Sequence, residues 1–226
     1  PPIPTTFDHL RGRDLVRPYE NSSELVEPDQ IVLLDTGAWA QLESMQEYLR
    51  HHLDHLLILD HHTSGDIPAV HRYIDIGAAA CAQIVTQLLD ELSPPNPSGT
   101  SLFSPTVCDA LYVGLASDTG WFRFSNTSPQ AYRLAARLLE GGVDHSRIYR
   151  ILEQTERPEK LALLTRALDS LELHADGRIA LMVLRSGDFD ETGAVIEETD
   201  RLIDIPQAVS TVSVVVMISE PPPNGD

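Results

Sequence analysis

The 226-residue chain is poor in cysteine, in basic residues and in long apolar runs, and each shortage excludes a class of protein. Only two cysteines occur, Cys81 and Cys108, and they form no C-x-x-C pair. We therefore expect reduced thiols in the core rather than a disulfide or a metal site. No segment reaches the eighteen or so apolar residues of a transmembrane helix, and the visible N-terminus lacks the apolar region of a signal peptide. These shortages predict a cytoplasmic protein with no membrane partner.

Acidic residues outnumber basic ones by 34 to 16, which gives a formal net charge of −18. Affinity for long polyanions comes largely from Lys and Arg, so this composition argues against binding of long nucleic acid. A short nucleotide can still bind where metal ions cancel the negative charge of the site. With 42% apolar residues, the chain is expected to bury one large core and part of a second.

The most informative segment is residues 56–62, which read LLILDHH. Four apolar residues predict a strand that is covered on both faces, as in a parallel sheet. The polar residues Asp60, His61 and His62 then fall at the carboxyl end of that strand, the edge at which open α/β sheets bind ligands. Imidazole nitrogen together with carboxylate oxygen suits Mn²⁺, Fe²⁺ or Zn²⁺ better than Ca²⁺. This segment predicts a metal site.

Two further segments end in the same way. Residues 31–37 (IVLLDTG) are an apolar run that ends in Asp35, and residues 111–120 (LYVGLASDTG) carry Asp118 before the same Thr-Gly pair. Any one of these Asp residues could instead be a helix cap or a turn residue. The three endings together favour a shared metal or phosphate site.

The pattern of elements predicts an α/β protein with a parallel sheet. Strands at 31–35 and 56–60 flank an amphipathic helix at 41–52, which is the β-α-β arrangement of such sheets. Helices are expected at 77–92 and 105–116, around a loop at 93–100. Ser128 and Asp144 are predicted to cap two more helices, and Pro158 to begin another that runs to about Leu173. Strands follow at 178–184 and 211–219, the second leading to an Asn224–Gly225 turn.

In order, the three motifs resemble motifs II, III and IV of the DHH phosphoesterase superfamily. The matching residues are DTG at 35–37, DHH at 60–62 and SDTGWFRFSNT at 117–127. The likeness is greatest to the bacterial oligoribonuclease/pAp phosphatase (NrnA-type) branch, and it covers nearly the whole chain. It implies a parallel-sheet DHH catalytic domain at 1–150, a helical connector at 151–175 and an incomplete α/β substrate domain (DHHA1) at 176–226.

The resemblance also implies a two-metal phosphoesterase that uses Mn²⁺, with Mg²⁺ as the alternative. Asp35 would bridge the two ions, and His61 and Asp118 would complete the shell of one of them. His62 would face the scissile phosphate as charge partner or proton donor, and Asp60 would orient the strand end or the ligand imidazole. Two ions roughly 3.5 to 4 Å apart can activate water and stabilise the attacking and leaving oxygens together.

Residues that follow Asp118 are weaker candidates for the site. Arg123 and Asn126 could reach a phosphate or a ribose, although a surface salt bridge is the ordinary fate of Arg. The aromatic residues around them are expected to pack beneath the site on at least one face. Gln83 stands where members of the family often carry Glu.

Members of the family begin with a further motif, a strand followed by His and an Asp-x-Asp pair, which nothing here matches. Residues 7–10 (FDHL) and Asp14 lack the preceding strand, so we expect a surface loop there. The chain starts at Pro1, and it also lacks the Gly-rich loop of the family's substrate domain. We therefore expect that required parts are missing at both ends, in which case this chain would itself be inactive.

The substrates that the resemblance implies are short oligoribonucleotides and 3′-phosphoadenosine 5′-phosphate. The alternatives are a phosphodiesterase of cyclic or linear dinucleotides, a pyrophosphatase, and a nucleotide sensor without turnover. The sequence leaves open whether the chain forms a homodimer. His51 and His55 have the i, i+4 spacing of a metal pair, but no H-E-x-x-H motif contains them, so we expect them to face solvent.

Overall fold

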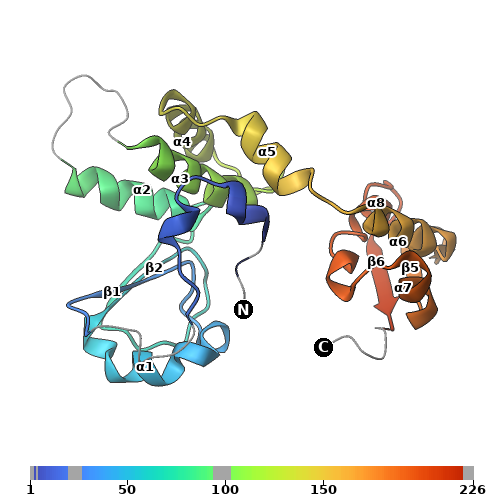
Figure 1. Cartoon of the computed structure of the whole chain (residues 1–226), viewed down its shortest axis with the longest axis horizontal. Helices are drawn as coiled ribbons and strands as arrows, with labels where there is room; N and C mark the ends of the chain where they lie inside the picture. Colours follow the sequence, from blue (N-terminus) through green and yellow to red (C-terminus); the bar gives the residue numbers. More distant parts are fainter. Residues whose placement is uncertain (1–2, 4, 20–26, 94–102, 221–226) are drawn as a thin grey trace. The chain divides into compact units, whose positions relative to one another are not determined.

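The computed structural model describes residues 3, 5–19, 27–93 and 103–220, and its contacts divide the chain into two compact units (Figure 1). The first unit is Pro1–Gln154 and the second is Thr155–Asp226, and each contains its own three-stranded sheet. Most of the predicted loop at 93–100 and the predicted Asn224–Gly225 turn lie outside the described residues. The α/β class predicted from the sequence is confirmed.

The sheet of the first unit is parallel, with β1 (Ile31–Leu34), β2 (Leu56–Asp60) and β3 (His71–Ile74) in that order. Leu34 lies opposite Leu59, so the carboxyl ends of β1 and β2 meet at one edge. The two predicted strands and their parallel pairing are therefore confirmed, and β3 is an addition that the sequence pattern did not indicate. Its residues are all exposed, which leaves no hydrophobic alternation to detect.

The helix predicted at 41–52 is wrong in its first half. Two 3-10 turns, Trp39–Gln41 and Glu43–Met45, come first, and α1 covers only Gln46–His51. The buried or half-buried side chains of Trp39, Leu42 and Met45 recur every three residues, which is the period of a 3-10 helix. They pack with Leu49 against one face of the sheet.

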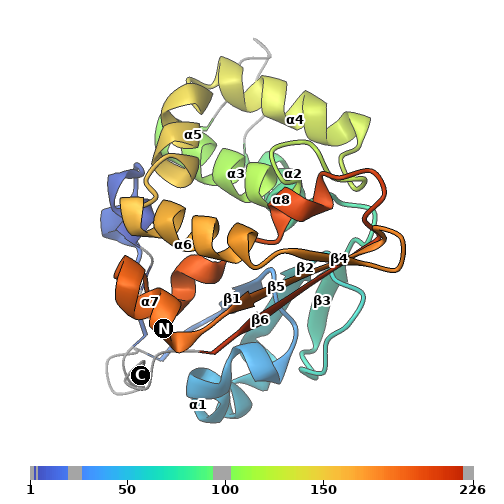
Figure 2. The same ribbon diagram turned by 90° about the vertical axis from the view of Figure 1, so that its right-hand side faces the viewer.

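Four helices form the rest of the first unit, with α2 covering the other face of β2 (Figure 2). The side chains of Ser128 and Asp144 cap α4 and α5 as predicted. The predicted helix at 105–116 is confirmed and ends two residues later, at Asp118. The bounds are α2 Cys81–Leu92, α3 Pro105–Asp118, α4 Pro129–Glu140 and α5 His145–Glu153.

The segment near the N-terminus packs on this helical layer through two 3-10 turns, Thr5–His9 and Arg13–Leu15, instead of the surface loop expected there. The guanidinium of Arg11 lies 3.4 Å from the buried carboxylate of Asp109 on α3, and Leu10 packs against the core of the layer. The N-terminal segment is therefore anchored by both charge and apolar contact.

The second unit has β4 (Glu172–His174) antiparallel to β5 (Ile179–Leu184), and β5 parallel to β6 (Val214–Ser219). The strands expected near 178–184 and 211–219 are confirmed. Alternate residues of β5, namely Ala180, Met182 and Leu184, are buried beneath the helices. The helices are α6 Pro158–Asp169, α7 Ser186–Thr192 and α8 Asp204–Gln207.

Helix α6 begins at Pro158 as predicted but ends at Asp169, earlier than Leu173, because the following residues turn into β4. Leu163 and Ala167 of α6 are fully buried in the core of the second unit. The helix therefore packs within that unit, and the bounds and roles assigned to the three domains stay predictions. No helix among the described residues is long and apolar enough to cross a membrane.

A charged pair joins α2 to α4, and its contribution to stability is expected to depend on pH. Arg137 donates to both carboxylate oxygens of Asp90 at 2.5 and 2.6 Å. These hydrogen bonds hold the pKa of Asp90 below its usual value despite partial burial. The stabilisation is therefore complete above the unfolded pKa of about 4 and disappears as the pH falls through the lower folded pKa.

We expect Asp90→Asn to lower the free energy of unfolding by about 0.5 to 1 kcal/mol at neutral pH, a modest value because both side chains are partly exposed. The deficit should shrink toward zero near pH 3. Urea unfolding at both pH values checks this, with the exposed neighbour Glu91→Gln as the control. A deficit that is equal at both pH values would contradict the ion-pair account.

Candidate metal centre

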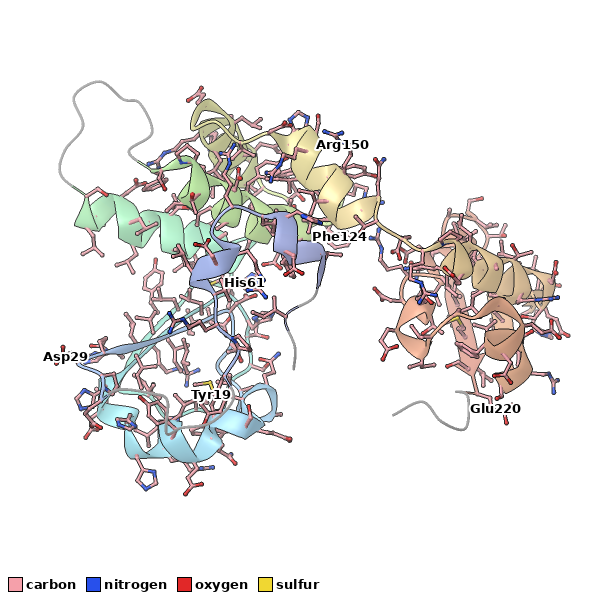
Figure 3. The ribbon with its side chains drawn as sticks, viewed as in Figure 1. Tyr19, Asp29, His61, Phe124, Arg150 and Glu220 are labelled. Atoms are coloured by element: carbon pink, nitrogen blue, oxygen red, sulfur yellow. The ribbon has the colours of Figure 1, made fainter. Side chains whose placement is uncertain are left out.

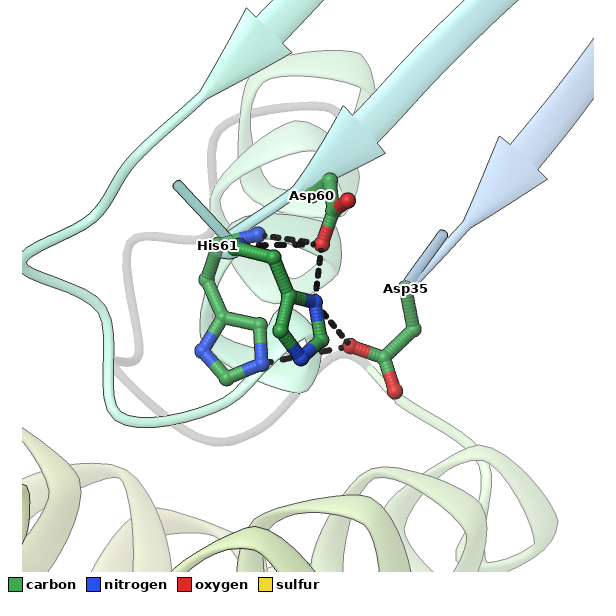
Figure 4. A group of neighbouring side chains, drawn as sticks. Asp35, Asp60 and His61 are labelled. Carbon is green, nitrogen blue, oxygen red and sulfur yellow. Dashed lines mark hydrogen bonds and ion pairs between the residues drawn. The ribbon is translucent and has the colours of Figure 1, made fainter. Parts of the chain in front are cut away.

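Asp35, Asp60 and His61 meet at the carboxyl edge of the first unit's sheet (Figure 4). Asp35 follows β1 directly, and its N–H donates to the carbonyl oxygen of Leu59 on β2 at 3.0 Å. Asp60 ends β2, and His61 and His62 follow it. Asp118 comes from a different kind of element, since it is the last residue of helix α3. Three segments far apart in the sequence therefore supply the site.

His61 lies at the centre of the group. Its Nε2 is 3.2 Å from Oδ1 of Asp35 and 3.6 Å from Oδ2 of Asp118. Its Nδ1 is 3.2 Å from the carbonyl oxygen of Ala78, which can only accept a hydrogen bond, so Nδ1 carries the proton. In the neutral ring the lone pair of Nε2 then points at two carboxylates. This arrangement is repulsive unless Nε2 carries a proton or a cation lies between the three groups.

Asp60 is 1% exposed and organises the two residues that follow it. Its Oδ1 accepts hydrogen bonds from the backbone N–H of His61 at 2.7 Å, from that of His62 at 3.1 Å, and from Nδ1 of His62 at 2.7 Å. Burial by itself would raise the pKa of Asp60, but these hydrogen bonds outweigh burial and lower it. The hydrogen bond between Asp60 and Nδ1 of His62, together with the charges of the nearby carboxylates, raises the pKa of His62.

The donor atoms fit a divalent cation. Asp35, Asp60, His61 and His62 each offer one ligand atom, and these atoms lie within 4.8 Å of one another. Asp60 already uses Oδ1 for its three hydrogen bonds, which suits it to orient the histidines instead of binding an ion. Burial, followed by the negative charge of Asp35, raises the pKa of Asp118. A bound cation would offset the repulsion between these two carboxylates.

The segment before α2 supplies contacts that the sequence analysis missed. Residues 77–80 were predicted to be helical, but α2 begins only at Cys81. Because residues 78 and 79 stay outside the helix, the carbonyl of Ala78 is available to His61, and the backbone N–H of Cys81 hydrogen-bonds to the carboxylate of Asp118. The run of small residues at 77–80 was the signal, since it permits a close approach of backbone to site.

Gln83 has a local role in this segment. Its Oε1 accepts a hydrogen bond from the backbone N–H of Ala79 at 2.5 Å, and its side chain is buried. A neutral side-chain amide therefore accepts a hydrogen bond from the main chain just before α2, in the segment that also contacts His61 and Asp118.

Two loops of the site are held together through Gly37 and Gly65. The carbonyl of Gly37 accepts from the N–H groups of Asp66 and Ile67 at 2.9 and 3.0 Å. A Cβ on Gly65 would lie 2.9 Å from that carbonyl oxygen, so only glycine allows this approach. The contact ties the turn that carries Asp35 to the loop that follows His62.

The two weaker candidates are placed differently from each other. Asn126 donates through its amide nitrogen to the carbonyls of Ala79 and Asp118 at 3.1 and 3.0 Å, so it links the loop after α3 to the segment before α2. Arg123 is exposed, and its Nε donates to the carbonyl of Gly120 at 2.8 Å. The substrate contacts suggested for both stay predictions.

The histidine pair at the end of α1 forms no such group. Nδ1 of His51 faces the carbonyl of Glu47, and Nδ1 of His55 faces that of Asp29. Within the ranges that the structure describes, the group around His61 is the one that could hold a metal ion.

Comparison with known proteins finds relatives of low sequence identity. No protein-family model matches the chain. The bifunctional oligoribonuclease and PAP phosphatase NrnA of Thermus thermophilus is 28% identical over 163 residues, which are 69% of this chain. The probable NrnA of Streptococcus mutans is 26% identical over 189 residues, which are 81% of it. These similarities support the resemblance to the DHH phosphoesterase superfamily.

The chain spans about half the length of the curated relatives it matches, 45% of the Thermus protein and 56% of the Streptococcus protein. Among solved structures, an exopolyphosphatase-related protein from Bacteroides fragilis superposes with a TM-score of 0.81 at 20% identity. That superposition covers 92% of this chain and 62% of the other, and it supports the fold.

We expect His61→Ala to weaken Mn²⁺ binding about 100-fold or more, because even partners that only orient a ligand contribute 10- to 100-fold. Asp60→Asn should weaken binding less, by about tenfold. Isothermal titration with Mn²⁺ measures both, and His145→Ala, an exposed histidine of the same unit, is the control. Unchanged binding by His61→Ala would show that the ion lies elsewhere.

Proposed function

We propose that this protein is a metal-dependent phosphoesterase that hydrolyses short oligoribonucleotides, 3′-phosphoadenosine 5′-phosphate, or both. The observation that carries the proposal is the convergence of Asp35 and Asp118 on Nε2 of His61. The names of the curated relatives, which specify oligoribonuclease and PAP phosphatase, support the choice of substrate class.

Asp35, His61 and Asp118 would hold the metal ion. Mixed imidazole and carboxylate ligands suit Mn²⁺, and Mg²⁺ is the alternative. When bound, divalent ions supply charge neutralisation of the phosphate and activation of water. The three side chains come from β1, the end of β2 and the end of α3, so the folded sheet and the helical layer together determine the site.

His62 would act directly on the substrate. Asp60 fixes its ring through Nδ1, and the side chain is 53% exposed, which leaves Nε2 available to a phosphate oxygen. The raised pKa of His62 favours the protonated form of the ring. A proton held at Nε2 can form a charge-assisted hydrogen bond with the phosphate or be donated to the leaving oxygen.

The charge of the protein favours short substrates. With a formal net charge of −18, the surface repels a long polyanion, whereas a nucleotide needs neutralisation only at the metal centre. This selection by length agrees with hydrolysis of oligoribonucleotides a few residues long.

We expect the product of the complete reading frame that contains this chain to release mononucleotides from a labelled trinucleotide in the presence of Mn²⁺. Asp35→Asn should lower kcat/KM about 100-fold or more, because it removes one of the converging carboxylates. Asp54→Asn, an exposed aspartate of the same unit, is the matched control. Undiminished hydrolysis by Asp35→Asn, or no hydrolysis of the trinucleotide and 3′-phosphoadenosine 5′-phosphate, would contradict the proposal.

A further inference from the structure

The loop after Asp118 presents one aromatic ring to solvent while it buries its neighbours. Trp121 and Phe122 pack partly buried against the core of the helical layer, with Phe122 stacked on Tyr132 at 5.5 Å between ring centroids. Phe124 differs, because 56% of its surface is exposed. The expectation that the aromatic residues pack beneath the site therefore holds for two of them and not for Phe124.

Phe124 is held rigidly although it is exposed. Its N–H donates to the carbonyl of Thr119 at 3.0 Å, and its carbonyl accepts from the N–H of Thr127 at 3.1 Å. The side chain of Asn126 fixes the same loop to Asp118 and Ala79. Single exposed apolar residues are common on proteins, so a role for Phe124 depends on its neighbours.

The ring rests on Gly120, only two residues after Asp118. Gly120 has a φ of +53°, and a Cβ at this position would lie 2.4 to 2.7 Å from three carbon atoms of the Phe124 ring. No other residue would let the ring lie so close to the backbone. One part of the ring is therefore seated on the backbone, while the remainder is open to solvent.

The loop that carries this ring is joined to the candidate metal centre. Asn126, two residues from Phe124, bonds to Ala79, and the adjacent residue Ala78 holds His61. Figure 3 shows His61 and Phe124 in the first unit, where the sheet meets the helical layer. In a nucleotide the base is separated from its phosphate by the ribose, so a surface for the base has to lie next to the metal centre and not within it.

We propose that Phe124 is the stacking surface for the nucleobase of the substrate whose phosphate binds at Asp35, His61 and Asp118. The proposal rests on the phosphoesterase function above and names the residue that would contact the base of those substrates. Stacking on an aromatic ring tolerates every base, because each base has a π-face. Phenylalanine has no hydrogen-bonding group, so this contact favours a base over no base and does not select among sequences.

The test compares binding of two small phosphates, adenosine 5′-monophosphate and ribose 5-phosphate, by isothermal titration in the presence of Mn²⁺. We expect Phe124→Ala to weaken binding of adenosine 5′-monophosphate about 5- to 150-fold, the worth of one base–aromatic stack. Binding of ribose 5-phosphate should be unchanged. Phe124→Trp should retain or strengthen binding of the nucleotide, and Leu139→Ala, which removes another exposed apolar side chain from the same unit, is the matched control.

The outcomes separate this proposal from the proposed function. If binding of adenosine 5′-monophosphate depends on Phe124 but no phosphoester is hydrolysed, the stacking role of Phe124 is supported and the proposed phosphoesterase activity is contradicted. Equal affinity of the unaltered protein for the two phosphates, or the absence of binding by either, overturns the stacking surface. A Phe124→Ala variant that binds both ligands more weakly by one factor also overturns it, since that result reports a damaged metal centre.

Discussion

The candidate site depends on one buried carboxylate, that of Asp60. Its Oδ1 accepts hydrogen bonds from two successive backbone N–H groups and from the ring of His62, so it determines both the turn after β2 and the orientation of that imidazole. A buried charge is costly unless it is fully hydrogen-bonded, and these bonds offset the cost. Because the turn also carries His61, the position of this candidate metal ligand depends on the same interaction.

The other parts of the site are brought to this turn by the architecture of the first unit. Parallel pairing of β1 with β2 puts Asp35 at the same sheet edge as His61, which a parallel arrangement always does for residues at strand ends. Asp118 lies at the end of a helix. Its backbone carbonyl accepts a hydrogen bond from the side-chain amide of Asn126, and its carboxylate accepts one from the N–H of Cys81. Carboxylates gathered in this way repel one another, so the fold supports a cluster that a cation stabilises.

Much of this arrangement was predictable from the sequence because apolar runs that end in polar residues mark strand ends. The motifs around Asp35, Asp60 and Asp118 predicted that these residues lie close together, and the structure brings them together around His61. What could not be predicted depends on contacts between distant segments. The 3-10 turns before α1 have a period close to that of an α-helix, and residues 77–80, with small helix-compatible side chains, stay outside the helix because tertiary hydrogen bonds hold them. Propensity is a weak guide where such bonds compete with it.

The exposure of Phe124 also could not be predicted, because the sequence at 121–124 does not show which of its aromatic rings is exposed. The left-handed backbone at Gly120, Trp121 and Phe122 turns the chain so that the first two rings enter the core and the third does not. A charged centre that neutralises phosphate attracts any phosphorylated molecule, including those without a base. An apolar surface beside it adds a second, independent requirement. Charge and stacking together would therefore select nucleotides, which neither interaction does alone.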